Sequence, residues 1–181
     1  MRPHILFPLF LLTSAGLLAQ ASKPEVLARI DAGRAPYEDI ALKIRDFAEV
    51  GYRELRSSAL LQERLKQEGF AVEAGVAGIP TAFVATAGSG SPVIAVLAEF
   101  DALPGASQEA VPEKKVRPGA TAGHACGHHL FGAGSVQAAV AIKDWLRASG
   151  RTGTVRLYGT PAEEGGSGKV YLVRAGLFRD V

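Results

Sequence analysis

The sequence feature that most constrains the fold is the apolar run Val93-Ile94-Ala95-Val96-Leu97-Ala98. Every position in the run is apolar, so both faces of the strand that it predicts are expected to be covered. A strand covered on both sides is typical of the centre of an α/β sheet. Glu99 and Asp101 follow the run directly, and the carboxyl end of a buried strand is where α/β proteins place ligands.

The segments around this run predict an α/β fold with a mixed sheet flanked by helices. Apolar residues at helical spacing and capping signals predict helices over residues 22–33, from Ala35 to a break at Gly51, from Ser57 or Ser58 to Glu68, over 132–149 and over 169–175. Strands are expected over residues 70–76, 81–86, 92–98 and 152–159. The segments 81–86 and 92–98 would form a hairpin-like pair. Residues 105–119 are polar and predict an exposed loop.

Residues 1–21 are expected to be a signal peptide outside the fold. Arg2 supplies a positive start, residues 5–18 form a short apolar stretch, and Ala19-Gln20-Ala21 fits cleavage before Ser22. The stretch is short for a membrane span, although a retained anchor is the alternative. Residues 22–181 would then be one exported domain, periplasmic or secreted, with no stable membrane span.

The charge of the chain gives no indication of a nucleic-acid partner. The formal net charge is only +2. The nearest approach to a basic cluster is Lys114, Lys115 and Arg117, which lie in the predicted loop. Such a short group is typical of a solvated loop rather than of a phosphate-binding surface.

The single cysteine and three of the four histidines of the chain lie within Gly123–His129. Cys126 and His128 are two residues apart, so in an extended or turning segment their side chains would point to the same side. A thiolate and an imidazole suit zinc and other first-row divalent ions. Taken alone, a coincidental buried pair is as plausible as a ligand pair. A lone cysteine in an exported protein is expected to be either buried or held by a metal.

The other two histidines of this segment and the carboxylates after the apolar run have open roles. His124 and His129 could be ligands, neighbours of the ligands or substrate contacts. Asp101 could orient a ligand histidine or bind the ion itself, and its alternative is a turn residue. Glu99 is more ambiguous still.

Glu163 and Glu164 follow the last predicted strand beside a glycine-rich turn. Two adjacent carboxylates repel each other without a cation, although an exposed acidic turn is the alternative. One could ligate a metal while the other takes a proton from water and passes it to a leaving amine. A hydrolase that uses Cys126 as its nucleophile is another alternative, but it leaves this glutamate pair without a role.

A phosphate-binding loop at Gly165–Lys169 does not fit its motif. Glu163 stands where the first glycine is required, and Val170 stands where a serine or threonine should follow the lysine.

Three segments together resemble the amidohydrolase branch of the M20 metallopeptidase family, with its p-aminobenzoyl-glutamate hydrolase subunits and dipeptidase-like amidohydrolases. They are Glu99-Phe100-Asp101-Ala102-Leu103-Pro104, Gly123-His124-Ala125-Cys126-Gly127-His128-His129 and Gly159-Thr160-Pro161-Ala162-Glu163-Glu164-Gly165-Gly166. Residues 75–84 are also similar to that group, and the resemblance spans residues 36–178.

The resemblance implies a zinc-exopeptidase-like catalytic domain that uses two divalent ions, Zn or Mn, to cleave an amide beside a free carboxylate. It implies Cys126, His128 and Glu164 as metal ligands, Glu163 as the general acid/base, and Asp101 as a catalytic residue near the ions. The substrate would be a small N-acyl amino acid, aminobenzoyl-glutamate or a dipeptide. The full-length protein would be a homodimer.

The sequence departs from the family pattern at two levels. His129 and Phe131 stand where many relatives carry Asp and His. Beyond the glutamate pair the family carries further ligand histidines and a dimerisation domain, whereas no histidine follows His129 here. Residues 22–181 are therefore expected to be the truncated N-terminal part of a catalytic domain. A non-catalytic, exported metal- or ligand-binding remnant is the alternative.

Overall fold

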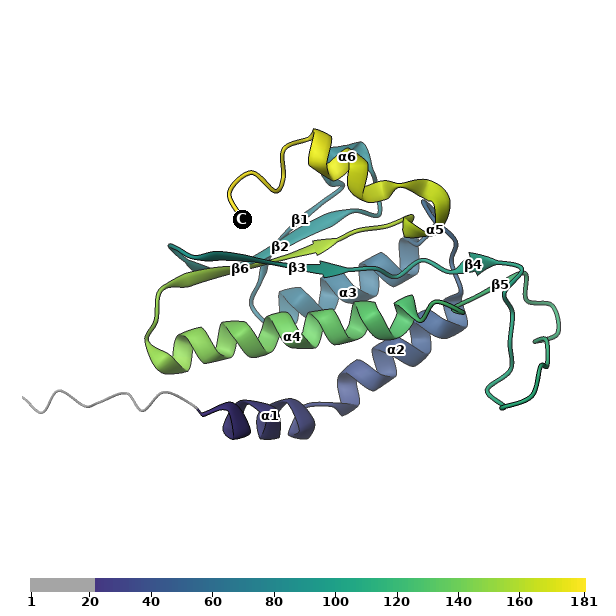
Figure 1. The fold of residues 1–181 in the computed structure, drawn as a ribbon, viewed down its shortest axis with the longest axis horizontal. Helices are drawn as coiled ribbons and strands as arrows, with labels where there is room; N and C mark the ends of the chain where they lie inside the picture. Colours follow the sequence, from purple (N-terminus) through teal and green to yellow (C-terminus); the bar gives the residue numbers. More distant parts are fainter. Residues whose placement is uncertain (1–21) are drawn as a thin grey trace, which may run out of the picture.

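The fold is built on one mixed four-stranded sheet, described by a computed structural model that covers residues 22–181. The predicted signal peptide lies outside these residues. The strands are β1 (Ala71–Ala74), β2 (Phe83–Ser89), β3 (Val93–Ala98) and β6 (Gly153–Gly159), in the order β1-β2-β6-β3 (Figure 1). β6 runs antiparallel to β2 and parallel to β3, and β1 runs antiparallel to β2. The predicted α/β class and mixed sheet are confirmed.

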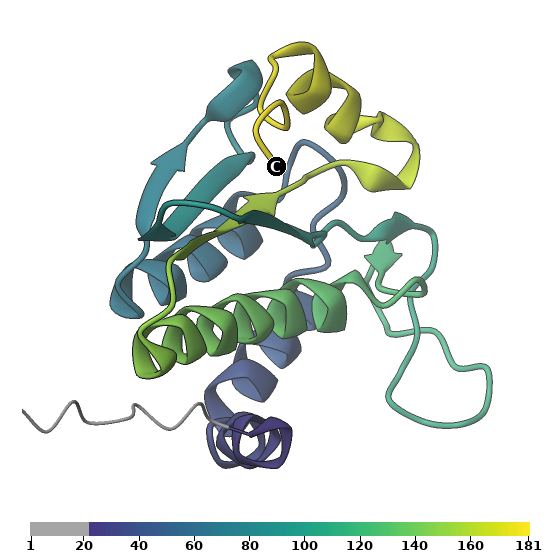
Figure 2. The same ribbon diagram turned by 60° about the vertical axis from the view of Figure 1, so that its left-hand side comes forward.

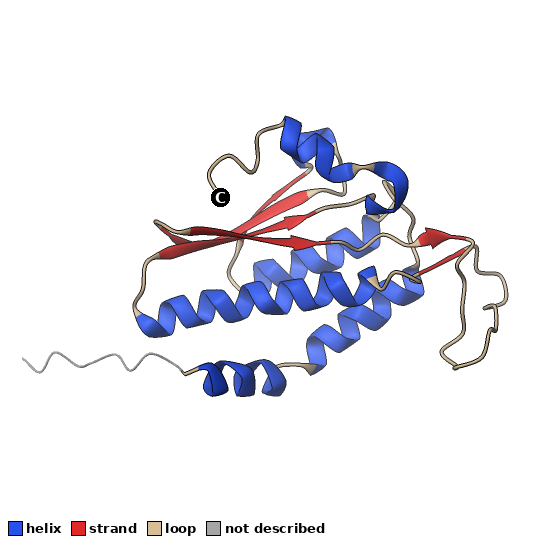
Figure 3. Cartoon of the chain, viewed as in Figure 1, coloured by secondary structure: helices blue, strands red, loops and turns tan. Residues whose placement is uncertain are grey.

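Helices cover both faces of this sheet (Figure 3). α2 (Ala35–Phe47), α3 (Leu55–Gln67) and α4 (His128–Ser149) lie on one face, with α1 (Lys23–Ala32) packed outside α4. The short elements η1 (Val76–Gly78), α5 (Glu163–Gly166) and α6 (Gly168–Arg174) lie on the other side, as the turned view shows (Figure 2). None of the helices within residues 22–181 is long and apolar enough to cross a bilayer.

Each face of the sheet has its own apolar core. Ile44, Leu61 and Val136 are fully buried between the sheet and α2, α3 and α4. Tyr158 and Leu172 are fully buried on the α6 side. Removing an aliphatic or aromatic side chain of this size from water contributes about 1.5–3 kcal/mol, so these contacts fix the helices against the strands whose ends carry the polar groups.

The prediction that residues 93–98 form a central strand is wrong, because β3 lies at the edge of the described sheet. Ile94 is 48% exposed and Ala95 is also exposed. The predicted hairpin-like pair of 81–86 and 92–98 is also wrong, because β6 lies between β2 and β3 and pairs with both. An apolar run shows that a strand is suited to burial, but it carries no information about which distant strand will pair with it.

Several element boundaries also differ from those predicted. α2 ends at Phe47 rather than near Gly51, because Ala48 adopts a left-handed conformation with φ 44°. α4 begins at His128, four residues before the predicted start. The strand predicted over 70–76 shortens to Ala71–Ala74, and Val76 belongs to η1. The segment predicted as a loop is an exposed excursion between the two-residue strands β4 (Leu103–Pro104) and β5 (Ala122–Gly123).

Candidate metal centre

The carboxyl ends of β3 and β6 bring the candidate residues to one edge of the sheet. These two strands are parallel, and their last residues, Ala98 and Gly159, are register partners. Glu99 and Asp101 therefore leave the sheet beside the segment that leads to Glu163 and Glu164. The amino end of α4 approaches the same edge and supplies His128.

His128 lies at the centre of this group and is 4% exposed. Its Nδ1 is 2.9 Å from Asp101 Oδ1 and 3.2 Å from the carbonyl oxygen of Asp101. A carbonyl oxygen can only accept, so Nδ1 carries a hydrogen, and in the neutral imidazole Nε2 then carries the lone pair. Asp101 is 1% exposed, and its Oδ2 accepts the backbone N–H of Glu164 at 2.8 Å. Asp101 thus fixes both the imidazole ring and the start of the glutamate pair.

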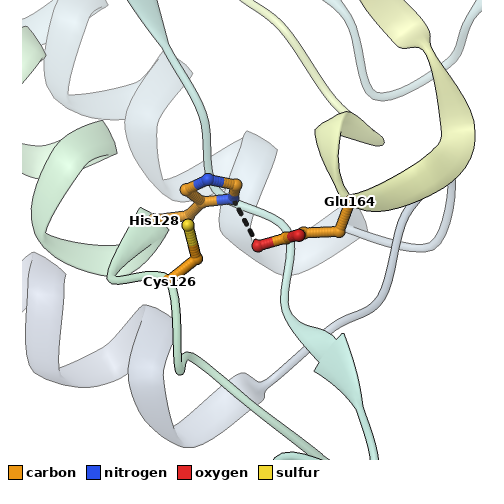
Figure 4. Close-up of side chains that lie close together, drawn as sticks. All are labelled: Cys126, His128 and Glu164. Carbon is orange, nitrogen blue, oxygen red and sulfur yellow. Dashed lines mark ion pairs between the residues drawn. The ribbon is translucent and has the colours of Figure 1, made fainter.

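Cys126, two residues before His128, and Glu164, from α5, converge on this ring (Figure 4). The cysteine sulfur, a ring nitrogen of His128 and a carboxylate oxygen of Glu164 all lie within 4.8 Å of one another. A second group with the same spacing consists of Glu99, His128 and Glu163. Nε2 of His128 is 3.0 Å from Glu99 Oε2 and 3.8 Å from Glu163 Oε2.

The donor set and its charge fit a divalent cation. Oε1 of Glu164 is buried and has no hydrogen-bond partner, and it lies 3.8 Å from Nδ1 of His128. An unpaired buried carboxylate oxygen is costly unless a cation meets it. Thiolate, imidazole and carboxylate together are typical zinc ligands and also suit other first-row ions. The residues present are therefore able to hold a metal.

The environment of Cys126 suits a metal ligand better than a nucleophile. The Glu164 carboxylate, with smaller effects from Glu163 and Glu99, raises the pKa of the thiol. Catalytic cysteines depend on the opposite shift, which favours the thiolate. Of the two expected alternatives for this cysteine, burial is excluded because Cys126 is exposed, and ligation of a metal remains. Its surroundings favour deprotonation only when a cation binds.

His124 and His129 point away from the glutamate pair. His124 Nε2 donates to the carbonyl oxygen of Ile44 at 3.2 Å, and the two rings lie 5.0 Å apart. Both side chains line a separate cavity of about 250 Å³ together with Arg45 and Arg117. Burial lowers the pKa of His124 to about 4, and burial and Arg45 lower the pKa of His129. The structure does not bring these two histidines into the group around Cys126.

Two residues that support the centre carried no signal in the sequence. Lys169, at the start of α6, forms an ion pair with Glu99. Glu54 is fully buried, and its carboxylate accepts the backbone N–H of Ala162 at 2.8 Å and the Thr81 hydroxyl at 3.0 Å. Ala162 has a left-handed φ of 55° and directly precedes the glutamate pair. Glu54 therefore anchors the turn that presents Glu163 and Glu164.

Comparison with known proteins agrees with this geometry. Residues 95–181 match peptidase family M20/M25/M40. A p-aminobenzoyl-glutamate hydrolase subunit of Escherichia coli is 49% identical over 154 residues, which are 84% of this chain and 32% of that protein. The Xaa-Arg dipeptidase of Mus musculus is 30% identical over 93% of this chain and 38% of that protein. The chain thus spans well under half of the length of these relatives.

A solved structure gives the same result for the fold. The YXEP protein of Bacillus subtilis, described as a dinuclear metal binding peptidase from the M20 family, superposes with a TM-score of 0.65 at 27% identity. The match covers 82% of this chain and 41% of that protein. The described residues therefore have the fold of part of a catalytic domain of this kind.

Proposed function

Since the chain belongs to peptidase family M20/M25/M40, we propose that it carries part of the active site of a metal-dependent amidohydrolase. The bond cleaved is the amide of a small substrate: an N-acyl amino acid, aminobenzoyl-glutamate or a dipeptide. The observation that carries this proposal is the convergence of Cys126, His128 and Glu164 beside Glu163 at the ends of two parallel strands.

Cys126, His128 and Glu164 are the residues that would hold the metal. A bound divalent ion supplies a water of lowered pKa and polarises the amide carbonyl. The full site is proposed to hold two ions, Zn or Mn, in keeping with the dinuclear centre named for the Bacillus subtilis relative. Asp101 keeps the hydrogen on Nδ1 of His128, so that the lone pair of Nε2 remains available as a ligand.

Glu163 is the proposed general acid/base. Its side chain is 42% exposed, and its Oε2 lies 3.8 Å from Nε2 of His128, at the edge of the group that faces solvent. The carboxylate accepts a proton from the attacking water as the new C–O bond forms. The same proton then passes to the amide nitrogen as the C–N bond breaks, which releases an amine and a carboxylic acid.

The test is the substitution Glu163→Gln, with Glu163→Ala beside it. Hydrolysis of p-aminobenzoyl-glutamate and simple dipeptides is measured with added Zn²⁺ or Mn²⁺, in the purified chain and in a longer protein that contains it. Loss of the proton carrier is expected to lower turnover by about 10²–10⁴-fold. Metal content should stay near that of the unsubstituted protein. Retained turnover would reject the role given to Glu163.

A matched control uses a carboxylate outside the centre. Glu113 is exposed in the loop between β4 and β5, so Glu113→Gln should leave both turnover and metal content unchanged. An equal loss in the control would point to a general charge effect rather than to proton transfer.

A non-catalytic metal- or ligand-binding role is the second candidate, favoured by the donor group of Cys126, His128 and Glu164, which needs no proton carrier to bind an ion. It predicts bound metal and substrate affinity without hydrolysis. The same assays separate the two, because only the hydrolase converts its substrate.

Export and dimerisation complete the proposal. Export to the periplasm or the medium rests on the sequence of residues 1–21, and a homodimer rests on the family resemblance. Mass spectrometry of the mature protein and light scattering would test them.

A further inference from the structure

The contact between Glu99 and His128 places a carboxylate oxygen against the ring nitrogen that carries no hydrogen in the neutral imidazole. Nδ1 of His128 faces the carbonyl oxygen and the carboxylate of Asp101, so it is the nitrogen that donates. In the neutral ring, Nε2 then presents its lone pair to Glu99 Oε2 at 3.0 Å. A lone pair and a carboxylate oxygen at this distance repel each other unless a proton or a metal ion lies between them.

Glu99 is also held in place from its other oxygen. Lys169 Nζ donates to Glu99 Oε1, and the Glu99 side chain is only 15% exposed. The two residues come from different elements, since Glu99 follows β3 and Lys169 belongs to α6. The ammonium therefore occupies one oxygen and leaves Oε2 directed at the histidine, close to Glu163 as well.

We propose that Glu99 is a ligand of the divalent ion that His128 binds through Nε2, and that Lys169 is the residue that positions its carboxylate. This inference rests on the proposed function and extends it by one ligand. Glu99 and Glu163 form with His128 a group whose donor atoms lie within 4.8 Å of one another, and this group shares only His128 with the group of Cys126 and Glu164. A carboxylate that bridges a metal ion and a fixed ammonium is a ligand oriented by its neighbour.

The competing account is a doubly protonated His128 ring held between Asp101 and Glu99. In that case Glu99 stabilises the metal-free protein and competes with the ion for Nε2. The two accounts predict opposite effects of removing the Glu99 charge, because loss of a ligand weakens metal binding and loss of a competitor strengthens it.

The experiment is a calorimetric Zn²⁺ titration of the full chain and of Glu99→Gln, which keeps the size of the side chain. Substitution of residues that only contact a metal ligand commonly lowers affinity 10–100-fold, so loss of a ligand itself should weaken Zn²⁺ binding by at least about tenfold. Lys169→Met removes the cation at Glu99 Oε1 and should also weaken Zn²⁺ binding, and Lys169→Arg, which restores a cation there, should recover it. Unchanged or tighter binding by Glu99→Gln overturns the proposal.

Controls separate a ligand role from a structural one. Glu73 is exposed on β1, so Glu73→Gln should bind Zn²⁺ normally. Cobalt(II) gives a second readout: Glu99→Gln should keep the Cys126 thiolate-to-cobalt band while its visible bands change with the ligand set. A folded variant with an unchanged visible spectrum would remove Glu99 from the ligand set.

The Zn²⁺ titrations give different results if only the role of Glu99 is wrong than if the proposed function is wrong. If the unsubstituted chain binds Zn²⁺ and Cys126→Ser abolishes binding, retention by Glu99→Gln rejects only the role of Glu99. If the unsubstituted chain binds no Zn²⁺, both proposals fail.

Discussion

Replacing Glu54 by alanine should strongly destabilise the fold. The carboxylate is fully buried, and it receives the backbone N–H of Ala162 and the hydroxyl of Thr81. Glu54→Ala leaves both donors buried without an acceptor, at about 1–3 kcal/mol each. The free energy of unfolding should therefore fall by about 2–6 kcal/mol, a large share of the roughly 5–15 kcal/mol of a typical domain.

Urea unfolding monitored by circular dichroism measures this loss. With a slope of about 2 kcal/mol per molar urea, the midpoint should fall by about 1–3 M. Glu54→Gln is the matched variant, because its carbonyl can accept from Ala162 and its amide can donate to Thr81. It should keep most of the stability. A change below about 0.5 kcal/mol in Glu54→Ala would refute the reasoning.

Three further predictions concern pH, backbone packing and thiol reactivity. Burial raises the pKa of Glu54, so the folded state holds the Glu54 proton more tightly than the unfolded state does. The stability that this proton contributes should be complete below the ordinary carboxyl pKa and should decline as pH rises through the raised pKa. Glu54→Gln should lack this decline when urea unfolding is measured as a function of pH. In Gly168→Ala, the new Cβ would clash with the carbonyl oxygen of Pro161, so thermal and urea unfolding should show a loss of about 1–3 kcal/mol in the free energy of unfolding. An unchanged midpoint would mean that the turn relaxes freely. Because Glu164 is the main cause of the raised pKa of the Cys126 thiol, Glu164→Gln should speed iodoacetamide alkylation of the metal-free protein at about pH 7–8, and a slower reaction would contradict that cause.

The sequence was sufficient to predict the elements that position the centre, because their signals are local. Apolar spacing predicted the helices, and the apolar run at 93–98 predicted a strand followed by Glu99 and Asp101. The pairing of that strand could not be predicted, because it depends on β6, which lies far away along the chain. A continuous apolar run fits an inner strand and a sheet edge equally well until its partners are known.

The members of the candidate centre were predicted better than their individual orientations. Six predicted residues meet at one sheet edge: Cys126, His128, Glu163, Glu164, Asp101 and Glu99. His129 does not join them, because α4 begins at His128 and successive helical residues point about 100° apart. Glu54 and Lys169 had no motif of their own: each acts by contacting a segment distant in the sequence, which only the folded chain reveals.

A cobalt(II) titration of the purified chain tests the central claim most directly. The claim is that Cys126, His128 and Glu164 hold one divalent ion between them. A thiolate-to-cobalt charge-transfer band should appear and saturate as cobalt is added, and Cys126→Ser should abolish it while His128→Asn weakens binding. A chain that shows no such band, or a band that Glu164→Gln and His128→Asn leave unchanged, would contradict the account.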